Sequence, residues 1–348
     1  MAKRRFFAED SYWNTKIEEH PTLHPKSQRY IRLLEIDREV QAGFHLNLFR
    51  WTIPIYEVTK DTPAVRVERR IAHHTGEGSS MYLHSKAYIG ENHPVGHAPG
   101  FGEAVPIPEE AIPDKESDSH MALVDYERGL AWDMWGAQKR PDGVWWSNSG
   151  ITYDLYGSGV FDPGQFSIHN GESIHMYGGC HAAGVPNIAG VILYDEIMEG
   201  KIEHKLCWAC KKVALLEHIY PPATWTDGAY PNGIPEGVLI QLDPELDLDR
   251  FGLTREEKVI ARALQEYGAA MVMCANSTTL YAEGLWSKKD KSWEGVLTEE
   301  GMMKIPFCHY RFLQSGETVE KGMIPPAHPG LFRDYYEKTG LPKGIRFV

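Results

Sequence analysis

The fold is decided above all by residues 119–137, SHMALVDYERGLAWDMWGA. Apolar and polar side chains alternate on both sides of Glu127-Arg128-Gly129, and such alternation is typical of β-strands. A glycine at the end of that tripeptide suits a tight turn. The stretch therefore predicts two strands joined at residues 127–129. Residues 144–157, VWWSNSGITYDLYG, predict a second unit of the same kind.

Composition extends this prediction to the whole chain. Its 348 residues include 10 Trp, 17 Tyr, 33 Gly and 22 Pro. Many short strands separated by turns account for that balance. We therefore predict a mainly β fold, a large β-sandwich or jelly-roll-like domain with one or two packed helices.

The predicted organisation has three parts. Residues 1–44 form an extended arm and a short helix, residues 45–313 form a single β-rich domain, and residues 314–348 form a tail that packs on it. Residues 90–118 are rich in Pro, Gly and acidic side chains and predict a long loop.

One helix has clear boundaries in the sequence. Thr254 and Glu257 have the spacing of a capping box, and Gly268 follows the last residue of an apolar stripe. These signals predict a helix over residues 254–267.

Net charge and hydropathy exclude several classes of protein. The net charge of −12 disfavours nucleic acid, because a nucleic-acid-binding protein neutralises phosphates with clustered Lys and Arg. No segment approaches the roughly 20 apolar residues of a membrane span. The opening MAKRRFF has no apolar run after it, so no signal peptide is expected. The chain as written is expected in the cytoplasm, or outside the cell if a leader was removed.

Cys207 and Cys210 form a CxxC motif, and His204 extends it to HxxCxxC. The surrounding segment has the pattern of a buried strand, on which residues three apart point to opposite faces. Core positions are therefore predicted for both thiols, with a metal or redox role as the alternative. The total of five cysteines is odd and fits a reducing compartment.

Several stretches between about residues 10 and 290 form a family-like pattern. They are WNT (13–15), SHMALVDYERGLAWDMWGA, VWWSNSGITYDL, AAGVPNIAGVILYDEIMEGKIEHKL (182–206), YPPAT (220–224) and IARALQEYGAAMVMCAN (260–276). Together they resemble a broad group of uncharacterised, mostly secreted bacterial and fungal β-rich proteins, sometimes joined to carbohydrate-binding modules. The resemblance implies an extracellular, glycan-associated context and no particular reaction. The chain departs from the group at Cys207 and Cys210, and residues 161–180 resemble an insertion.

Asp133 is the leading candidate for acid–base catalysis. Its neighbours Trp132, Met134 and Trp135 predict an apolar environment, which raises the pKa of a carboxyl group and suits a general acid. The alternative is a solvent-facing Asp133 whose two neighbours point inward.

Histidines supply the other candidates. His120 as base and Tyr153 as acid would suit a lyase that removes the proton next to a uronate carboxylate. His181 lies in a Gly-rich loop and is a further catalytic candidate. Alternatively His120, Asp133, His181 and His204 are ligands of a divalent metal. The leading interpretation requires no cofactor.

Aromatic side chains predict a sugar-binding platform. Trp145 and Trp146 are adjacent on a predicted strand, so one of them faces away from the core that the other fills. Trp135 and Trp146 are the predicted stacking residues, with Asn148 and Arg140 as polar contacts to substrate. The alternative is that these tryptophans only fill the core.

Together these features predict a glycan-active enzyme, a polysaccharide lyase or a glycoside hydrolase, with polysaccharide or oligosaccharide as its partner. A lyase requires Arg or Lys near the uronate, and Lys139 and Arg140 are the nearest; a hydrolase requires two facing carboxylates. Two alternatives stay open: a non-catalytic carbohydrate-binding or structural assembly protein, and a His/Asp metalloenzyme acting on a small molecule. Oligomerisation is compatible with each.

Overall fold

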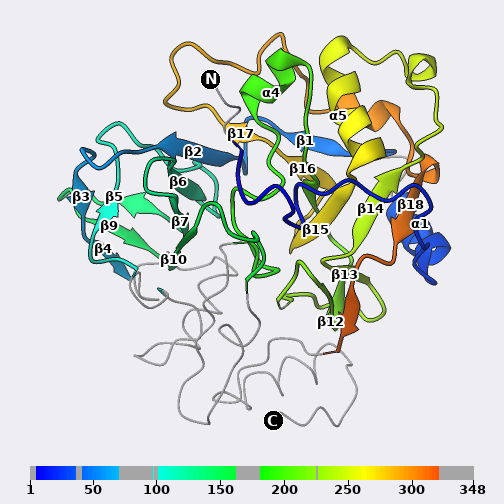
Figure 1. Ribbon diagram of the computed structural model, residues 1–348, viewed down its shortest axis with the longest axis horizontal. Coiled ribbons are helices and arrows are strands. Elements are labelled where there is room, and N and C mark those ends of the chain that lie inside the picture. The colour runs from blue at the N-terminus through cyan, green and yellow to red at the C-terminus, as the bar shows by residue number, and fades with distance from the viewer. Residues whose placement is uncertain are drawn as a thin grey trace.

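The computed structural model describes residues 5–36, 41–69, 97, 101–161, 181–224 and 226–320. Within these residues the protein is mainly β, as predicted, with two large sheets, three smaller ones and three α-helices (Figure 1). The helices are α1 (Ser27–Glu35), α4 (Tyr194–Glu199) and α5 (Arg255–Glu266). The strands are β1 (His45–Asn47), β2 (Ile53–Glu57), β3 (Ala64–Val65), β4 (Val67–Arg69), β5 (Val105–Pro106), β6 (Met121–Asp125), β7 (Leu130–Trp135), β8 (Gln138–Lys139), β9 (Trp145–Ser147), β10 (Ser149–Asp154), β11 (Leu206–Cys210), β12 (Val213–Tyr220), β13 (Ile234–Glu236), β14 (Leu239–Leu242), β15 (Ala269–Cys274), β16 (Thr279–Tyr281), β17 (Glu283–Gly284), β18 (Tyr310–Leu313) and β19 (Glu317–Val319).

The larger sheet has the strand order β1-β16-β11-β15-β14-β18 and mixes parallel with antiparallel pairs. Its central strands β11 and β15 run parallel and are buried almost throughout. Strands that are covered on both faces have continuous apolar sequences, without alternation of apolar and polar residues. Trp208 and Met271 face the core under α1 and α5, whereas Cys207 and Val272 face the second sheet.

The second sheet has the order β10-β7-β6-β2-β17. Its centre is the predicted hairpin of β6 and β7, which is confirmed. Asp125 accepts a hydrogen bond from the Arg128 backbone N–H at 2.7 Å, and Gly129 takes a positive φ of 68° that closes the turn. Small side chains of this sheet, Ala122 and Ala131, pack toward the larger sheet. The two sheets thus share one core in a sandwich-like arrangement.

The prediction of a separate hairpin over residues 144–157 was wrong. β10 pairs with β7, and β9 pairs with β8 in a small sheet that also contains β4. Residues 130–139 and 145–154 therefore form the two arms of one bent hairpin, and its turn is Pro141-Asp142-Gly143. Pro-Asp-Gly is a strong turn signal. It lies just before residue 144, outside the segment 144–157 that was predicted to contain the turn.

The chain ends expected to flank the β domain are packed against it where they are described. Phe7 and Ala8 donate backbone hydrogen bonds to residues 155 and 157, and Trp13 is buried with its indole N–H on the Gly159 carbonyl at 2.8 Å. Residues 321–348 of the predicted tail lie outside the described residues. In the described part of that tail, β19 pairs with β12. Of the predicted loop, residues 101–118 are described and are irregular apart from β5.

The predicted capping box is present at the start of α5. Thr254 accepts from the Glu257 N–H at 3.1 Å, and the Glu257 carboxylate accepts from the Thr254 N–H at 2.8 Å. We expect Thr254→Ala to lower the free energy of unfolding by about 1 kcal/mol, because a helix-end N–H loses its partner. Urea unfolding measures the change. Thr254→Ser keeps the hydroxyl and should unfold like the wild type; equal destabilisation by both changes would contradict a capping role.

Candidate functional site

Two imidazoles lie together where the two large sheets meet. His120 directly precedes β6, and His181 opens a turn that bridges back to Val185. Both side chains are fully buried, and their ring centroids lie 5.5 Å apart. The His181 ring also lies 5.5 Å from that of Tyr281 in β16. The structure thus brings two of the predicted catalytic residues together and adds a phenol that the sequence analysis missed.

The His181 imidazole is neutral at physiological pH. Burial lowers its pKa well below the ordinary value, and the neighbouring His120 lowers it further, while the Asn187 backbone opposes the shift only in part. Within the described residues neither ring nitrogen makes a hydrogen bond of normal geometry. Buried polar atoms are nearly always paired, so an unpaired imidazole marks a place where a ligand or water binds.

Asp133 is buried at the centre of β7. One carboxyl oxygen accepts from the Tyr153 hydroxyl at 3.0 Å and the other from the Asn187 backbone N–H at 2.6 Å. Burial raises its pKa to about 7. The solvent-facing alternative is wrong, because Asp133 is fully buried, but Trp132 and Met134, two of the neighbours from which an apolar environment was predicted, fill a second core on the opposite face of the sheet.

Two further carboxyl groups, those of Glu236 in β13 and of Asp227 in the chain before it, were missed in the sequence analysis. Glu236 ends β13 beside His218 of β12 and is fully buried, whereas Asp227 is exposed. Glu236 Oε2 accepts from the Asp227 N–H at 3.2 Å, and Oε1 has no partner among the described residues. Burial, followed by the negative charge of Asp227, raises the pKa of Glu236 well above its ordinary value. The protonated form of Glu236 is therefore favoured, and burial, followed by the charge of Asp118, also raises the pKa of the neighbouring Asp227 carboxyl group, to about 6.

Electrostatic interactions connect Tyr281 with Asp118 and Asp227. Burial raises the pKa of Tyr281 well above 10, and the charges of Asp118 and Asp227 raise it further. Asp118 also interacts with Asp227. The Tyr281 hydroxyl lies 3.3 Å from the Met273 sulfur. We call the resulting group of six side chains the inter-sheet cluster; its members are Asp118, His120, His181, Asp227, Glu236 and Tyr281.

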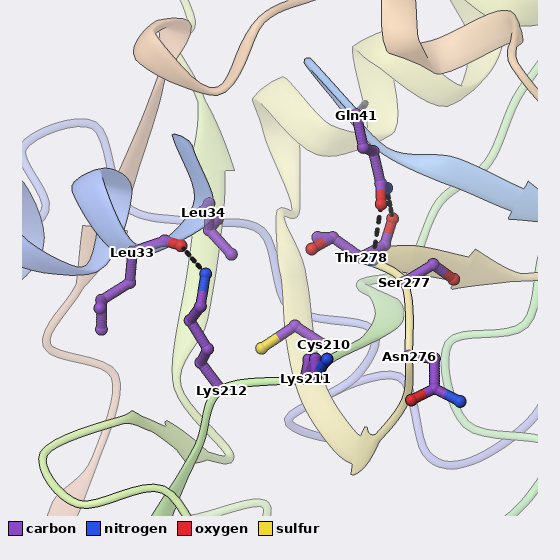
Figure 2. A pocket seen from close by; sticks show the side chains of 9 residues that line it. All are labelled: Leu33, Leu34, Gln41, Cys210, Lys211, Lys212, Asn276, Ser277 and Thr278. Atoms are coloured by element: carbon purple, nitrogen blue, oxygen red, sulfur yellow. Dashed lines mark hydrogen bonds between the residues drawn. The ribbon is translucent and has the colours of Figure 1, made fainter. Parts of the chain in front are cut away.

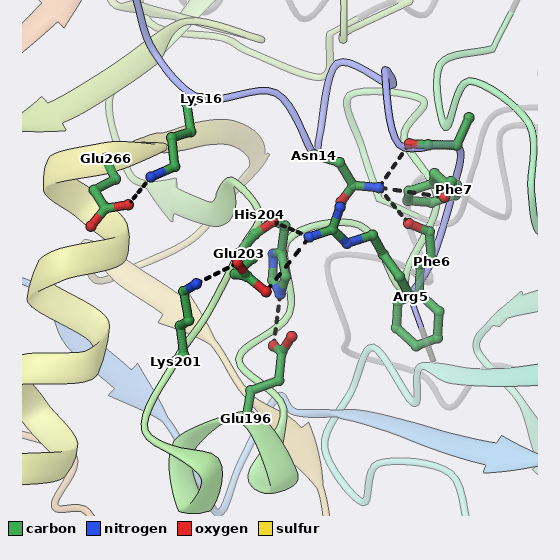
Figure 3. Close-up of polar contacts among 11 residues, drawn as sticks. Arg5, Phe6, Phe7, Asn14, Lys16, Glu196, Lys201, Glu203, His204 and Glu266 are labelled. Carbon is green, nitrogen blue, oxygen red and sulfur yellow. Dashed lines mark hydrogen bonds and ion pairs between the residues drawn. The ribbon is translucent and has the colours of Figure 1, made fainter. Parts of the chain in front are cut away.

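The fourth predicted metal ligand lies elsewhere. His204 has Nε2 2.8 Å from a Glu196 carboxylate oxygen and donates from Nδ1 to the Lys205 carbonyl at 2.8 Å. Figure 3 shows His204 among Glu196, Glu203 and Arg5, in a polar group of its own. Nowhere in the described part of the chain do three His, Cys, Asp or Glu side chains come together as metal ligands. The predicted set of His120, Asp133, His181 and His204 is therefore not assembled there.

Trp135 lies on the same face of the second sheet as Asp133, and Asn148 neighbours it. Trp135 is two residues beyond Asp133 and so shares its face of the sheet, at the strand position across from His120. Asn148 donates its backbone N–H to the Trp135 carbonyl at 2.9 Å. Trp135 is half-buried and, of the two predicted platform residues, is the one on the face of the second sheet that Asp133 shares.

Trp146 and Arg140 lie on the other side of the second sheet. Trp145 is buried in the core on the face opposite Asp133. Trp146, the next residue of β9, points away from that core. The Trp146 indole donates to Gln138 at 2.9 Å, and the Arg140 guanidinium lies 5.3 Å from its ring centroid. Arg140 is also paired with Asp142 at 2.8 Å. The structure thus does not bring these two predicted substrate contacts to the inter-sheet cluster.

Both CxxC thiols occupy core positions. Cys207 and Cys210 face opposite sides of β11, as predicted. Burial raises the pKa of the Cys210 thiol to about 12 and that of Cys207 further, so both stay protonated at neutral pH. Cys210 lines a cavity of about 280 Å³ beside α1, in which Lys212 donates to the Leu33 carbonyl at 2.9 Å (Figure 2).

Comparison of the chain with protein-family models, with curated proteins and with solved structures gave no significant match. In the part of the chain that the structure describes, no helix combines the length and apolar character that crossing a bilayer requires.

Proposed function

We propose that the protein is a glycan-active enzyme, a glycoside hydrolase whose acid–base pair is Glu236 and Asp227. One observation carries the proposal: the buried Glu236 carboxyl group, whose pKa is raised well above its ordinary value, is electrostatically coupled to a second carboxyl group, that of Asp227, whose pKa is raised to about 6. Environments that push the pKa values of two carboxyl groups apart distinguish the acid from its ionised partner in glycosidases.

Glu236 is suited to the role of general acid. Its Oε2 accepts the Asp227 N–H, which leaves the proton on Oε1, the atom without a partner among the described residues. That proton would pass to the glycosidic oxygen as the bond to the sugar carbon breaks. The Asp227 carboxylate would stabilise the positive charge on that carbon or activate the incoming water. Addition of water to the sugar carbon completes hydrolysis, and the proton that this water loses restores the acid form of Glu236.

The remaining groups would bind and orient the sugar. Neutral His181 and the un-ionised Tyr281 phenol offer hydrogen bonds to hydroxyl groups without adding charge. Trp135 offers a flat face on which a sugar ring can stack. Asp133 acts as a positioning residue, because its carboxyl group holds the Asn187 backbone that adjoins His181.

Hydrolysis is favoured over β-elimination by the charges at the cluster. Elimination requires a cation on the uronate carboxylate at the reacting sugar. The cluster instead carries the acidic residues Asp118 and Asp227, and Arg140 is paired with Asp142 at the outer sheet. Negative charge at the reaction centre repels a uronate there.

A panel of neutral and acid-bearing glycans tests the proposal. We expect the purified protein to release reducing ends without the ultraviolet absorbance of unsaturated uronates. Appearance of that absorbance would show elimination instead. The absence of both signals across the panel would favour the non-catalytic binding alternative.

A further inference from the structure

Two thiols lie side by side on neighbouring strands of the larger sheet. Cys210 is the last residue of β11 and Cys274 is the last residue of β15, and the register of this parallel pair places them directly opposite each other. The Ala275 N–H donates to the Cys210 carbonyl at 2.9 Å, which continues the pairing beyond the two cysteines. The two thiols are also close enough to interact electrostatically. The function proposed above uses neither of them.

This arrangement meets the geometric requirements of a disulfide bond. Neighbouring strands lie about 4.8 Å apart, within the roughly 4.4–6.8 Å that separates the Cα atoms of bonded cysteines. Residues that oppose each other on adjacent strands also point to the same face of the sheet. Cys207, by contrast, faces the other side of β11, so the CxxC spacing does not bring its own two thiols together. The cysteine that can bond to Cys210 is therefore Cys274.

The two thiols differ in their access to solvent. Cys274 is exposed, whereas Cys210 is buried and lines the cavity of about 280 Å³ beside α1 (Figure 2). An oxidant in solution therefore reaches Cys274 first, and Cys210 is in place to react with the oxidised sulfur. An accessible thiol next to a second, resolving thiol is the arrangement of redox-responsive cysteines.

The ionisation of the two thiols makes the reaction slow and its product stable. The pKa of each thiol is raised to about 12, first by burial and, at Cys274, then by the charges of Asp227 and Glu236. Only a thiolate attacks an oxidant, so oxidation proceeds slowly at neutral pH. The reduced pair gains no stabilisation from an ionised thiol, however, and the disulfide therefore resists reduction once it has formed.

We propose that Cys210 and Cys274 form a disulfide bond across the larger sheet when the protein meets hydrogen peroxide. The Cys274 sulfur attacks one peroxide oxygen, which breaks the O–O bond, forms a sulfenic acid and releases the other oxygen as water. The Cys210 sulfur then attacks the Cys274 sulfur and displaces its oxygen as a second water. The two thiols lose two electrons and two protons, and both pass to the peroxide.

Peptide mapping of the full-length protein tests the assignment. Trypsin places Cys207 and Cys210 in one peptide, residues 206–211, and Cys274 in another, residues 263–288. The protein is incubated with hydrogen peroxide at mildly alkaline pH, its remaining thiols are alkylated in urea, and it is digested without reductant. We expect mass spectrometry to find the two peptides joined, and dithiothreitol to separate them. A bond within residues 206–211, or complete alkylation of Cys210 and Cys274 after peroxide treatment, would overturn the proposal.

Alanine variants identify the bonded pair. Cys210→Ala and Cys274→Ala should each abolish the joined peptide. Cys207→Ala is the matched control, because Cys207 is equally buried in the same strand but faces the opposite side, and it should keep the joined peptide. Persistence of the joined peptide in Cys210→Ala, or its loss in Cys207→Ala, would assign the bond to Cys207 and contradict the proposal.

Urea unfolding gives a second readout. A bond between residues 210 and 274 constrains the unfolded chain, so peroxide-treated wild type should unfold at a higher urea concentration than the same protein after reduction. Cys274→Ala replaces an exposed side chain and should show no such difference between the two treatments. An equal shift in wild type and Cys274→Ala would show that another oxidation product causes it.

Discussion

Replacing Glu236 by Gln is expected to lower kcat for glycan hydrolysis by about 10²–10⁴-fold, while KM stays close to the wild-type value. The amide keeps the shape of the protonated carboxyl group and can still accept the Asp227 N–H, but it cannot give a proton to the leaving oxygen. Initial rates of reducing-end release over a range of substrate concentrations separate the two constants.

Glu196→Gln is the matched control for this change. Glu196 is also a buried glutamate, but its carboxylate contacts His204 in the separate polar group of Figure 3. Its variant should keep wild-type kcat. Equal loss of activity in both variants would point to a general structural effect, and full activity of Glu236→Gln would remove Glu236 from the mechanism.

Asp133 is expected to make the protein less stable as pH rises from about 4 to about 7. Its pKa is about 7 in the folded state and 3.8 for the ordinary group. Folding therefore favours the protonated form, and this stabilisation is complete below pH 3.8 and is lost as pH rises through 7. The loss reaches about 4 kcal/mol, at 1.36 kcal/mol for each pH unit between the two values.

The Asp133→Asn variant tests that account. Asparagine cannot ionise, so the difference in unfolding free energy between variant and wild type should shift in favour of the variant by several kcal/mol from pH 4 to pH 7.5. Urea unfolding at pH 4, 5.5 and 7.5 measures it. The exposed Asp249→Asn change serves as the control and should leave this large dependence intact. Parallel curves for wild type and Asp133→Asn would show that Asp133 is ionised in the folded protein.

Local patterns predicted the parts of the fold that local interactions form. The hairpin of β6 and β7 follows from alternation and Gly129, and the start of α5 follows from Thr254 and Glu257. The error over residues 144–157 arose because the strand pattern continues through Asn148 while the turn lies earlier, at residues 141–143.

Only some of the residues of the candidate site were predicted from the sequence. Asp133, His120 and His181 lie in or next to strongly patterned segments, which led to their selection as candidates, and the structure buries all three. Glu236 and Asp227 lie more than 40 residues further along the chain, and the pairing of β12 with β13 brings them into place. Nothing in their local sequence marks that tertiary arrangement. At the HxxCxxC motif the buried-strand pattern correctly predicted core positions for both thiols, and His204 contacts Glu196 rather than the thiols.

The most direct test of the acid–base pair is the pH dependence of kcat/KM for glycan hydrolysis by the wild-type protein. The account predicts a bell-shaped profile, with an acidic limb from ionisation of Asp227 and a basic limb from loss of the Glu236 proton. Burial and the charge of Asp227 place that basic limb well above the ordinary pKa of a glutamate. A rate that keeps rising into the alkaline range, with no basic limb, would contradict the central claim that protonated Glu236 is the general acid.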